Sequence, residues 1–258
     1  MADIVTRRTL ITRGAQAGLV LGAGPVLSGC DILTEDPRAR KLMMVAEGVH
    51  QTGQRSLQAR TALAREFTWA DLSPKFHANG TLNPGTPEYV RHVRTGFADW
   101  RLAVRGMVSQ PLALSMAQLR VMRTRTQITR HDCVEGWSAI GQWTGVPLAD
   151  VLQTAGVASQ ARYVVFRCAD VLDGVPYYES IDMVDAFHPQ TILAWGMNGR
   201  VLPVAHGAPL RLRVERQLGY KHAKYVMGID VVDSLKTIGR GQGGYWEDAL
   251  DYEWYAGI

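Results

Sequence analysis

The sequence has few cysteines and lacks the paired spacings that usually mark a metal or redox site. Its 258 residues include three cysteines, and no CxxC, CxxCH or HExxH pattern occurs. A disulfide-stapled secreted domain would carry more cysteines, and a chain of this length buries enough core not to need them. The missing patterns exclude a covalent c-type haem in this chain and argue against a zinc finger, a thioredoxin-like motif and a zinc hydrolase. Each cysteine therefore needs its own explanation.

A strong charge of one sign is also missing. The formal net charge is +4, and the first 29 residues supply +2 of it, because three arginines there face one aspartate. The remaining +2 is spread without a dense basic face, which argues against a nucleic-acid partner. No internal repeat or low-complexity stretch occurs, so one domain with short appendages is the natural organisation.

The N-terminus has the pattern of an export signal. Arg7 and Arg8 precede a Gly/Ala-rich run over 14–27, which is shorter than the roughly 20 apolar residues of a membrane span. The arginine pair matches the twin-arginine pattern, whose pathway exports proteins already folded around a cofactor. The run ends in the letters LSGC, which resemble the lipobox of bacterial lipoproteins. We therefore expect 1–29 to be a signal peptide and Cys30 to be lipidated, anchoring the protein on the periplasmic side of a bacterial membrane. The alternative is an amphipathic or buried helix that begins the fold.

Beyond Cys30 the spacing of apolar residues changes from helical to strand-like. Helical spacing from Pro37 to Leu72 predicts a helical linker or anchor segment over 30–72. Turn residues dominate 73–96, which predicts a long loop of the kind that often binds a ligand. Short helices are predicted at 116–121 and 147–155, and strands at 97–108, 124–130, 163–168, 177–181, 191–197 and 210–214. The folded part, 73–258, is expected to be α+β with strands dominating.

One cysteine, Cys133, lies among charged and aromatic residues in the segment RHDCVEGWS. It follows a predicted strand end, where a side chain can point into a pocket. Positive neighbours favour a thiolate, and Arg130 and His131 lie within three residues of it. The residues alone leave three interpretations open: a buried structural cysteine, a soft ligand for a metal, or a nucleophile or disulfide partner.

Two downstream segments combine glycine or proline with cationic side chains. The first ends in HGAPLR and contains His206 and Arg211, and the second is GYKHAK at 219–224. Glycine and proline set turns that bring backbone close to a ligand, and the cationic side chains can bind phosphate or carboxylate groups. Taken alone, each segment is more typical of a solvated basic loop.

Together and in this order, HDCVEGWS, the strand ending FRC, HGAPLR and GYKHAK resemble the molybdopterin domain of the sulfite oxidase family. The resemblance is to its bacterial periplasmic branch in particular, the catalytic subunits similar to protein-methionine-sulfoxide reductase. It spans Ser73 to Ile258 and includes the tail that begins at Gly244. Several spaced motifs agree, although no single motif would suffice. The resemblance implies a strand-rich molybdopterin domain preceded by a helical segment.

The resemblance also assigns roles to particular residues. It implies that Cys133 binds molybdenum through its thiolate, beside the dithiolene of a single pterin. A disulfide with Cys168 would remove this ligand, and we do not expect one. The cofactor-binding residues that the resemblance implies are Cys133, Cys168, His206, Arg211, His222, Ala223 and Lys224, with Phe76, His77 and Asn79 as a strip over the pterin.

The implied reaction is two-electron oxygen-atom transfer. Reduction of a sulfoxide or N-oxide, fed by a membrane haem or quinol-linked partner, fits the bacterial branch. Oxidation of sulfite, with electrons passed to a cytochrome, fits the wider family, and a non-catalytic lipoprotein that keeps the fold is a further alternative. We expect Glu135 and Arg130 to shape the substrate pocket or relay protons, because they lie within three residues of Cys133.

Overall fold

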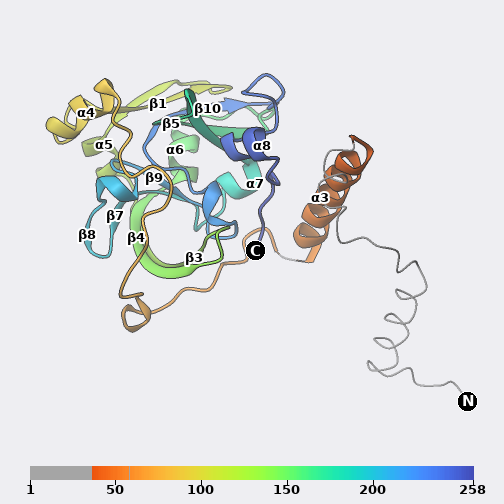
Figure 1. Ribbon diagram of the computed structural model, residues 1–258. Helices are drawn as coiled ribbons and strands as arrows, with labels where there is room; N and C mark the ends of the chain where they lie inside the picture. Colours follow the sequence, from red (N-terminus) through yellow and green to blue (C-terminus); the bar gives the residue numbers. More distant parts are fainter. Residues whose placement is uncertain (1–36, 58) are drawn as a thin grey trace, which may run out of the picture. The chain divides into compact units, whose positions relative to one another are not determined.

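The computed structural model describes residues 37–57 and 59–258 (Figure 1). The chain divides into two compact units, 1–52 and 53–258. Helix α3, Pro37–Leu57, is the first described element. The predicted signal peptide, 1–29, and Cys30 lie outside the described residues. In the part of the chain that the structure describes, no helix combines the length and the apolar character needed to span a membrane.

The prediction of a helix up to Leu72 is wrong beyond Leu57. Residues 59–72 contain only the 3-10 turn η1, Trp69–Asp71, as helical structure. The backbone bonds elsewhere: the Phe67 N–H donates to the Ile128 carbonyl at 2.8 Å. Because these groups pair with strand β3, Arg125–Asp132, they are not available for a helix.

The first sheet has five strands in the order β2-β1-β10-β5-β6. Figure 1 labels β1, β10 and β5 of this sheet. Strands β1 and β10 are parallel, and the other neighbours are antiparallel. The strands are β1 (Arg101–Gly106), β2 (Leu112–Ser115), β5 (Tyr163–Leu172), β6 (Val175–Asp182) and β10 (Val226–Val232). The pairing of β5 with β6 is irregular between Arg167 and Val171.

The second sheet is built on the β3–β4 hairpin and has the order β3-β4-β7-β8, with β9 paired to β7. Its register pairs Asp132 with Ser138, so the hairpin loop covers 133–137 and contains Cys133. The further strands are β4 (Ser138–Pro147), β7 (Ile192–Met197), β8 (Arg200–Val201) and β9 (Arg211–Arg213).

Short helices connect the strands. Helices α5, Met116–Val121, and α6, Leu148–Ala155, confirm their predictions, the first with a capping box between Ser115 and Gln118. The predicted loop 73–96 is wrong in its last third, because it contains α4, Pro87–Arg94. Thr86 caps that helix and proline occupies its first turn. The remaining helical turns are α7 (Met183–Ala186), η2 (Val204–His206), η3 (Gly219–Lys221) and α8 (Tyr245–Leu250).

The main core joins both sheets. It contains buried side chains from the five-stranded sheet, such as Phe166 and Ile229, together with Leu152 of α6 and Leu212 of β9. A smaller cluster forms around Trp143 of β4, and Phe76 packs against it. The α+β prediction is confirmed, and this packing brings the ends of β3 and β9 close to the C-terminal part of β5.

Candidate functional site

The tight loop between β3 and β4 holds Cys133 in a fixed position. The Cys133 N–H donates to the Trp137 carbonyl at 2.9 Å, and the Gly136 N–H donates to the Cys133 carbonyl at 3.0 Å. Gly136 has φ +88°, a left-handed conformation that favours glycine. The Cys133 residue is 8% exposed and its thiol is free. The loop therefore presents a buried thiol at the end of the hairpin.

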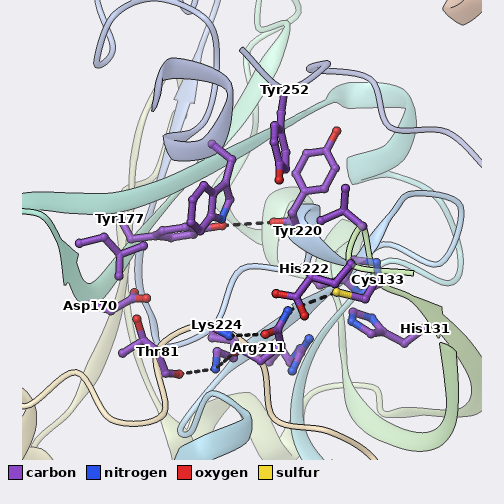
Figure 2. Close-up of a pocket in the computed structure, with 17 residues that line it drawn as sticks. Thr81, His131, Cys133, Asp170, Tyr177, Arg211, Tyr220, His222, Lys224 and Tyr252 are labelled. Carbon is purple, nitrogen blue, oxygen red and sulfur yellow. Dashed lines mark hydrogen bonds between the residues drawn. The ribbon is translucent and has the colours of Figure 1, made fainter. Parts of the chain in front are cut away.

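Cys133 lines a cavity of about 230 Å³ (Figure 2). Its walls come from five parts of the chain: the strip 79–81, the β3–β4 loop, the β5–β6 hairpin, the segment from β9 to Lys224, and the C-terminal α8 with Tyr252. Figure 2 shows Cys133 and Asp170 on opposite sides of this cavity, with Arg211 and Lys224 between them. The cavity therefore exists only when segments far apart in the sequence have packed together.

The strip 79–81 contacts the Cys133 thiol and is held in place by hydrogen bonds from Lys224. The Asn79 Nδ2 donates to the Cys133 Sγ at 3.2 Å. The Lys224 ammonium donates to three carbonyls, those of Asn79 at 2.6 Å, Ala205 at 3.1 Å and Thr81. Burial, followed by the Arg211 charge, lowers the pKa of Lys224 to about 7. All three donors of this ammonium are engaged with backbone, so Lys224 fixes the strip that touches the Cys133 sulfur.

Arg211 supplies the cationic floor of the cavity. It is 5% exposed, and its Nη1 donates to the His206 carbonyl at 3.3 Å. Its Nε–H has no hydrogen-bond partner among the described residues. Burial and the nearby Arg213 lower the pKa of Arg211 to about 9. A buried cation with an unpaired N–H is costly unless an anion completes it, so this floor suits an anionic ligand.

The opposite wall is aromatic. Tyr220 and Tyr252 meet edge to face with ring centroids 5.1 Å apart, and Trp246 stacks on Tyr252 at 6.1 Å. Tyr177 continues this wall, and its hydroxyl donates to the Tyr220 carbonyl at 3.2 Å. The cavity thus combines a cationic floor with an apolar wall.

A buried carboxyl, Asp170, lies at the far end of the cavity from the thiol. The residue is 4% exposed, and its Oδ1 has no partner within the described chain. Burial raises the pKa of Asp170 to about 6, although the Lys224 charge acts in the opposite direction. This end of the cavity therefore accepts hydrogen bonds.

Six of the predicted site residues line the cavity: Asn79, Cys133, Glu135, Arg211, His222 and Lys224. His222 is buried, and its Nε2 lies 3.1 Å from the Gln217 carbonyl oxygen. Glu135 is exposed at the cavity and accepts from the Trp137 Nε1 at 3.3 Å. These six come from four separate segments, and the structure brings them together.

Five further predicted residues lie outside the cavity lining. Phe76 packs its ring near His206, with centroids 5.8 Å apart, and His77 lies beside Trp137 at 5.5 Å. Ala223 is buried, and its carbonyl accepts from the Leu212 N–H at 2.8 Å. None of the following five residues lines the Cys133 cavity: Phe76, His77, Cys168, His206 and Ala223.

Cys168 lines a different cavity, together with Tyr89 and Met227. Asp170, two residues further along β5, lines the Cys133 cavity instead. Burial raises the pKa of the Cys168 thiol well above its usual value. The sequence therefore predicted the right strand, but Asp170 and not Cys168 is the residue of that strand that lines the Cys133 cavity.

Arg130 also lies outside the cavity, and the expected positive surroundings of Cys133 need correction. The Arg130 side chain is 57% exposed and pairs with Asp132, with its Nε donating to Oδ2 at 2.9 Å. His131 is buried, and burial together with His222 and Arg213 lowers its pKa well below the usual value. The cationic charge near the thiol comes from Arg211, which is distant in sequence.

The comparisons with known proteins agree with this site. Residues 89–237 match the model of the oxidoreductase molybdopterin-binding domain family. A protein of Azospira oryzae named as protein-methionine-sulfoxide reductase subunit YedZ1 is 37% identical over 99% of this chain and 89% of its own length. The protein-methionine-sulfoxide reductase catalytic subunit MsrP of Xanthomonas campestris pv. campestris is 32% identical over 82% of this chain and 67% of its own.

A solved structure supports the same fold. The sulfane dehydrogenase SoxCD from Paracoccus pantotrophus superposes with a TM-score of 0.50 at 24% identity, over 53% of this chain and 39% of that one. Fold and site thus define a molybdopterin-binding oxidoreductase. The chain belongs to the oxidoreductase molybdopterin-binding domain family, in agreement with the predicted resemblance.

The residues of the cavity fit such a cofactor. The buried Cys133 thiol is a soft ligand, which molybdenum in a sulfur-rich centre prefers. The unpaired Nε–H of Arg211 is a donor for an anionic group such as the cofactor phosphate. The Asp170 Oδ1, which has no partner among the described residues, can accept a hydrogen bond from the polar edge of a pterin ring.

Proposed function

We propose that this enzyme reduces a sulfoxide by oxygen-atom transfer, with molybdenum held by Cys133 and a single pterin. The observation that carries the proposal is the Cys133 thiol in one cavity with the unpaired Arg211 Nε–H and the aromatic wall. The names of the two relatives, both protein-methionine-sulfoxide reductase subunits, support the choice of substrate. Their description as subunits also supports an electron-supplying partner, for which we propose a membrane haem or quinol-linked protein.

The cofactor, when bound, supplies the two-electron oxygen-atom chemistry. Cys133 would be its protein ligand, and Asn79 would hold the Cys133 sulfur in place through its side-chain amide. Arg211 would pair with the phosphate, and His222 and Lys224 would shape the same end of the cavity. His206, Ala223, Cys168, Phe76 and His77 would support these residues from behind, and no covalent haem is expected in this chain.

The aromatic wall favours an uncharged organic sulfoxide over sulfite. Tyr177, Tyr220, Trp246 and Tyr252 offer apolar faces on which a thioether or sulfoxide sulfur packs well. Sulfite is a small, strongly hydrated anion and gains nothing from such faces. The wall is therefore a reason to prefer sulfoxide reduction to sulfite oxidation.

Glu135 is our candidate for moving protons. Reduction of a sulfoxide consumes two electrons and two protons, and it yields the sulfide and water. Glu135 lies at the cavity and is exposed, so it can exchange protons with solvent and pass them inward. Arg130 does not line the cavity, and we assign it no part in this transfer.

We also propose that the chain is exported folded by the twin-arginine route and anchored through lipidated Cys30. The Arg7-Arg8 pair and the LSGC letters support this. The domain division 1–29, 30–72 and 73–258 is part of the same proposal. The substrate and the electron partner would then meet the enzyme on the periplasmic side of the membrane.

The test compares the exported wild-type protein with Cys133→Ser. We expect wild type to contain molybdenum and to reduce dimethyl sulfoxide with a reduced dye, and the variant to fall to the assay background while remaining folded. Elemental analysis and circular dichroism check metal content and folding. Wild-type protein that lacks molybdenum would favour a non-catalytic lipoprotein. Molybdenum-loaded protein that oxidises sulfite and reduces no sulfoxide would reverse the assigned direction.

A second test addresses Glu135. We expect Glu135→Gln to lower kcat at unchanged molybdenum content by about 100-fold, the usual contribution of a positioned proton donor. Glu88→Gln changes an exposed carboxylate that lines a different cavity and is the matched control. Equal kcat in wild type and Glu135→Gln would exclude the proton-transfer role.

A further inference from the structure

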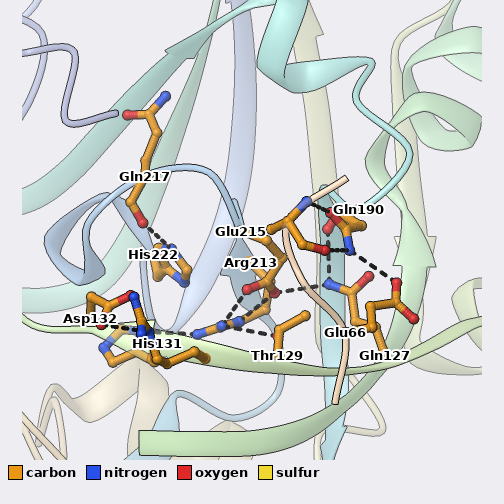
Figure 3. A network of polar contacts seen from close by, with 12 residues as sticks. Glu66, Gln127, Thr129, His131, Asp132, Gln190, Arg213, Glu215, Gln217 and His222 are labelled. Atoms are coloured by element: carbon orange, nitrogen blue, oxygen red, sulfur yellow. Dashed lines mark hydrogen bonds and ion pairs between the residues drawn. The ribbon is translucent and has the colours of Figure 1, made fainter. Parts of the chain in front are cut away.

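His131 lines the cavity two residues before Cys133 and is held from behind by a buried ion pair (Figures 2 and 3). The Arg213 Nη1 lies 3.0 Å from the His131 Nδ1. Arg213 in turn donates to Glu215 at 2.9 Å from Nε and at 2.6 Å from Nη2, and both side chains of this pair are fully buried. The Gln127 Nε2 donates to the same carboxylate at 2.8 Å, which fixes the pair on β3.

This arrangement determines which nitrogen of His131 carries the proton. A guanidinium has five N–H donors and no acceptor. The His131 Nδ1 must therefore accept from Arg213, and the ring proton must be on Nε2. Glu215 holds the Arg213 guanidinium in place through two hydrogen bonds, so the choice of tautomer is built into the fold.

The Nε2 edge of the His131 ring lies against Gly219, and both residues line the cavity. A Cβ at Gly219, itself a lining residue, would lie 2.5 Å from both Cε1 and Nε2 of His131, so glycine at this position leaves room for the ring. Phe76 and Trp137 pack near the ring at centroid distances of 5.5 Å, and His222 at 5.0 Å, which fixes its plane. Within the described residues, the one side-chain hydrogen bond of His131 is at Nδ1.

We propose that His131 is a substrate-binding residue, a permanent Nε2–H donor to the oxygen of the sulfoxide beside Cys133. The proposal rests on the proposed function, because it needs an oxygen-bearing substrate in this cavity. A sulfoxide oxygen is a strong acceptor, and negative charge grows on it as the sulfur–oxygen bond is reduced. A donor held in one orientation needs no reorganisation when that charge develops. The Arg213–Glu215 pair acts through His131 and is a positioning pair.

The kinetic test uses molybdenum-loaded enzyme and dimethyl sulfoxide as the probe. We expect His131→Phe, which keeps a planar ring and removes the donor, to lower kcat/KM per bound molybdenum by about 10- to 100-fold. His131→Gln retains an N–H donor and should recover most of this loss. His92→Phe removes another buried histidine, which lines a different cavity, and should match wild type.

A purely structural role would have a different result. It would lower the amount of folded or molybdenum-loaded protein and leave kcat/KM per molybdenum unchanged. Wild-type kcat/KM in loaded His131→Phe, or equal losses in His131→Phe and His131→Gln, would overturn the proposal.

The tautomer can be measured without any turnover. We expect ¹⁵N NMR of histidine-labelled, oxidised, loaded enzyme near pH 7.5 to show His131 protonated at Nε2 alone, with His131→Phe identifying the signal. Protonation at Nδ1, or at both nitrogens, would overturn the donor assignment. If loaded wild type reduces no sulfoxide, the proposed function fails, and the NMR result still decides whether His131 is the donor described here.

Discussion

At the scale of single residues, several glycines occupy places where a side chain has no room. Gly145 lies at an irregularity in the pairing of β4 with β7. A Cβ there would lie 2.2 Å from the Leu193 carbonyl oxygen and 2.6 Å from the Ala194 Cα. The strands approach this closely because position 145 carries no side chain, and the approach helps to bring β9 to the cavity through β7.

We expect Gly145→Ala to lower the free energy of unfolding by about 1–3 kcal/mol, because the added methyl group collides with backbone that has to move. Urea denaturation followed by circular dichroism measures this. Gly53→Ala in α3 is the control, since nothing lies within 4 Å of its Cβ and alanine favours a helix by roughly 0.5–1 kcal/mol. Equal midpoints for Gly145→Ala and wild type would show that the sheet adapts at no cost.

The chemistry of single residues could be predicted only in part. The sequence motif around Cys133 and the downstream arginine predicted a thiol with an anion-binding partner, and the structure places both at one cavity. The tautomer of His131 depends on Arg213, which lies 82 positions away. Asp170 lines the cavity within an irregularity in the pairing of β5 with β6, which no local pattern reveals. Local sequence patterns therefore identify candidate site residues, whereas contacts with distant residues determine the tautomer of His131 and which residue of β5 lines the cavity.

At the scale of elements, a buried cation joins three segments around the cavity. The Lys221 Nζ of η3 lies 2.5 Å from a Glu179 oxygen on β6 and 2.5 Å from a Glu247 oxygen on α8, and all three side chains are fully buried. The neighbours Tyr220 and Trp246 line the aromatic wall. The cluster therefore holds both parts of that wall against the first sheet.

The pH dependence of stability should reveal this cluster. Burial, followed by the Glu247 charge, raises the pKa of Glu179 well above the usual 4.5. A raised pKa in the folded state stabilises the protein below about pH 4.5, and this contribution is lost as the pH rises through the folded pKa. We therefore expect the free energy of unfolding to decline above pH 4.5, and to decline less in Glu179→Gln. Urea titrations between pH 4.5 and 8 measure the two slopes, and identical slopes would contradict this origin.

Removing the Lys221 ammonium should lower the free energy of unfolding more than Glu179→Gln does. Lys221→Met leaves the buried carboxyl groups of Glu179 and Glu247 without their shared cation, which costs about 3–5 kcal/mol at neutral pH. The double variant Lys221→Met with Glu179→Gln also replaces one of the two buried carboxyl groups with a neutral amide. It should therefore recover part of the lost free energy of unfolding. Both variants are compared with wild type by the same urea titrations.

Elements with strong local signals were predicted, whereas strand β4, whose own pattern is broken by turn residues, was not. Helix α5 has a capping box at Ser115, and α6 ends at Gly156 in the left-handed conformation, so both were identified. Strand β4 contains Gly141, Gly145 and Pro147, which local patterns assign to turns. It forms because β3 and β7 pair on either side of it.

At the scale of the whole molecule, the cavity depends on nearly the entire folded chain. Its lining begins at Asn79 and ends at Tyr252, and it includes residues from both sheets. A chain that is still unfolded cannot present Cys133, Arg211 and the aromatic wall together. We therefore expect cofactor insertion to follow folding, which agrees with the proposed export of the folded protein.

Two N-terminal variants separate export from anchoring. We expect Arg7→Lys with Arg8→Lys to leave folded, molybdenum-loaded protein in the cytoplasm, because the twin-arginine route recognises the pair and the cavity is complete before export. Cys30→Ser removes the site of acylation, so the protein should still be exported but should no longer need detergent for release from the membrane. Cell fractionation with molybdenum analysis of each fraction measures both outcomes. Export of the arginine variant with full molybdenum content would exclude the twin-arginine route, and membrane retention of Cys30→Ser would show that another part of the molecule provides the anchor.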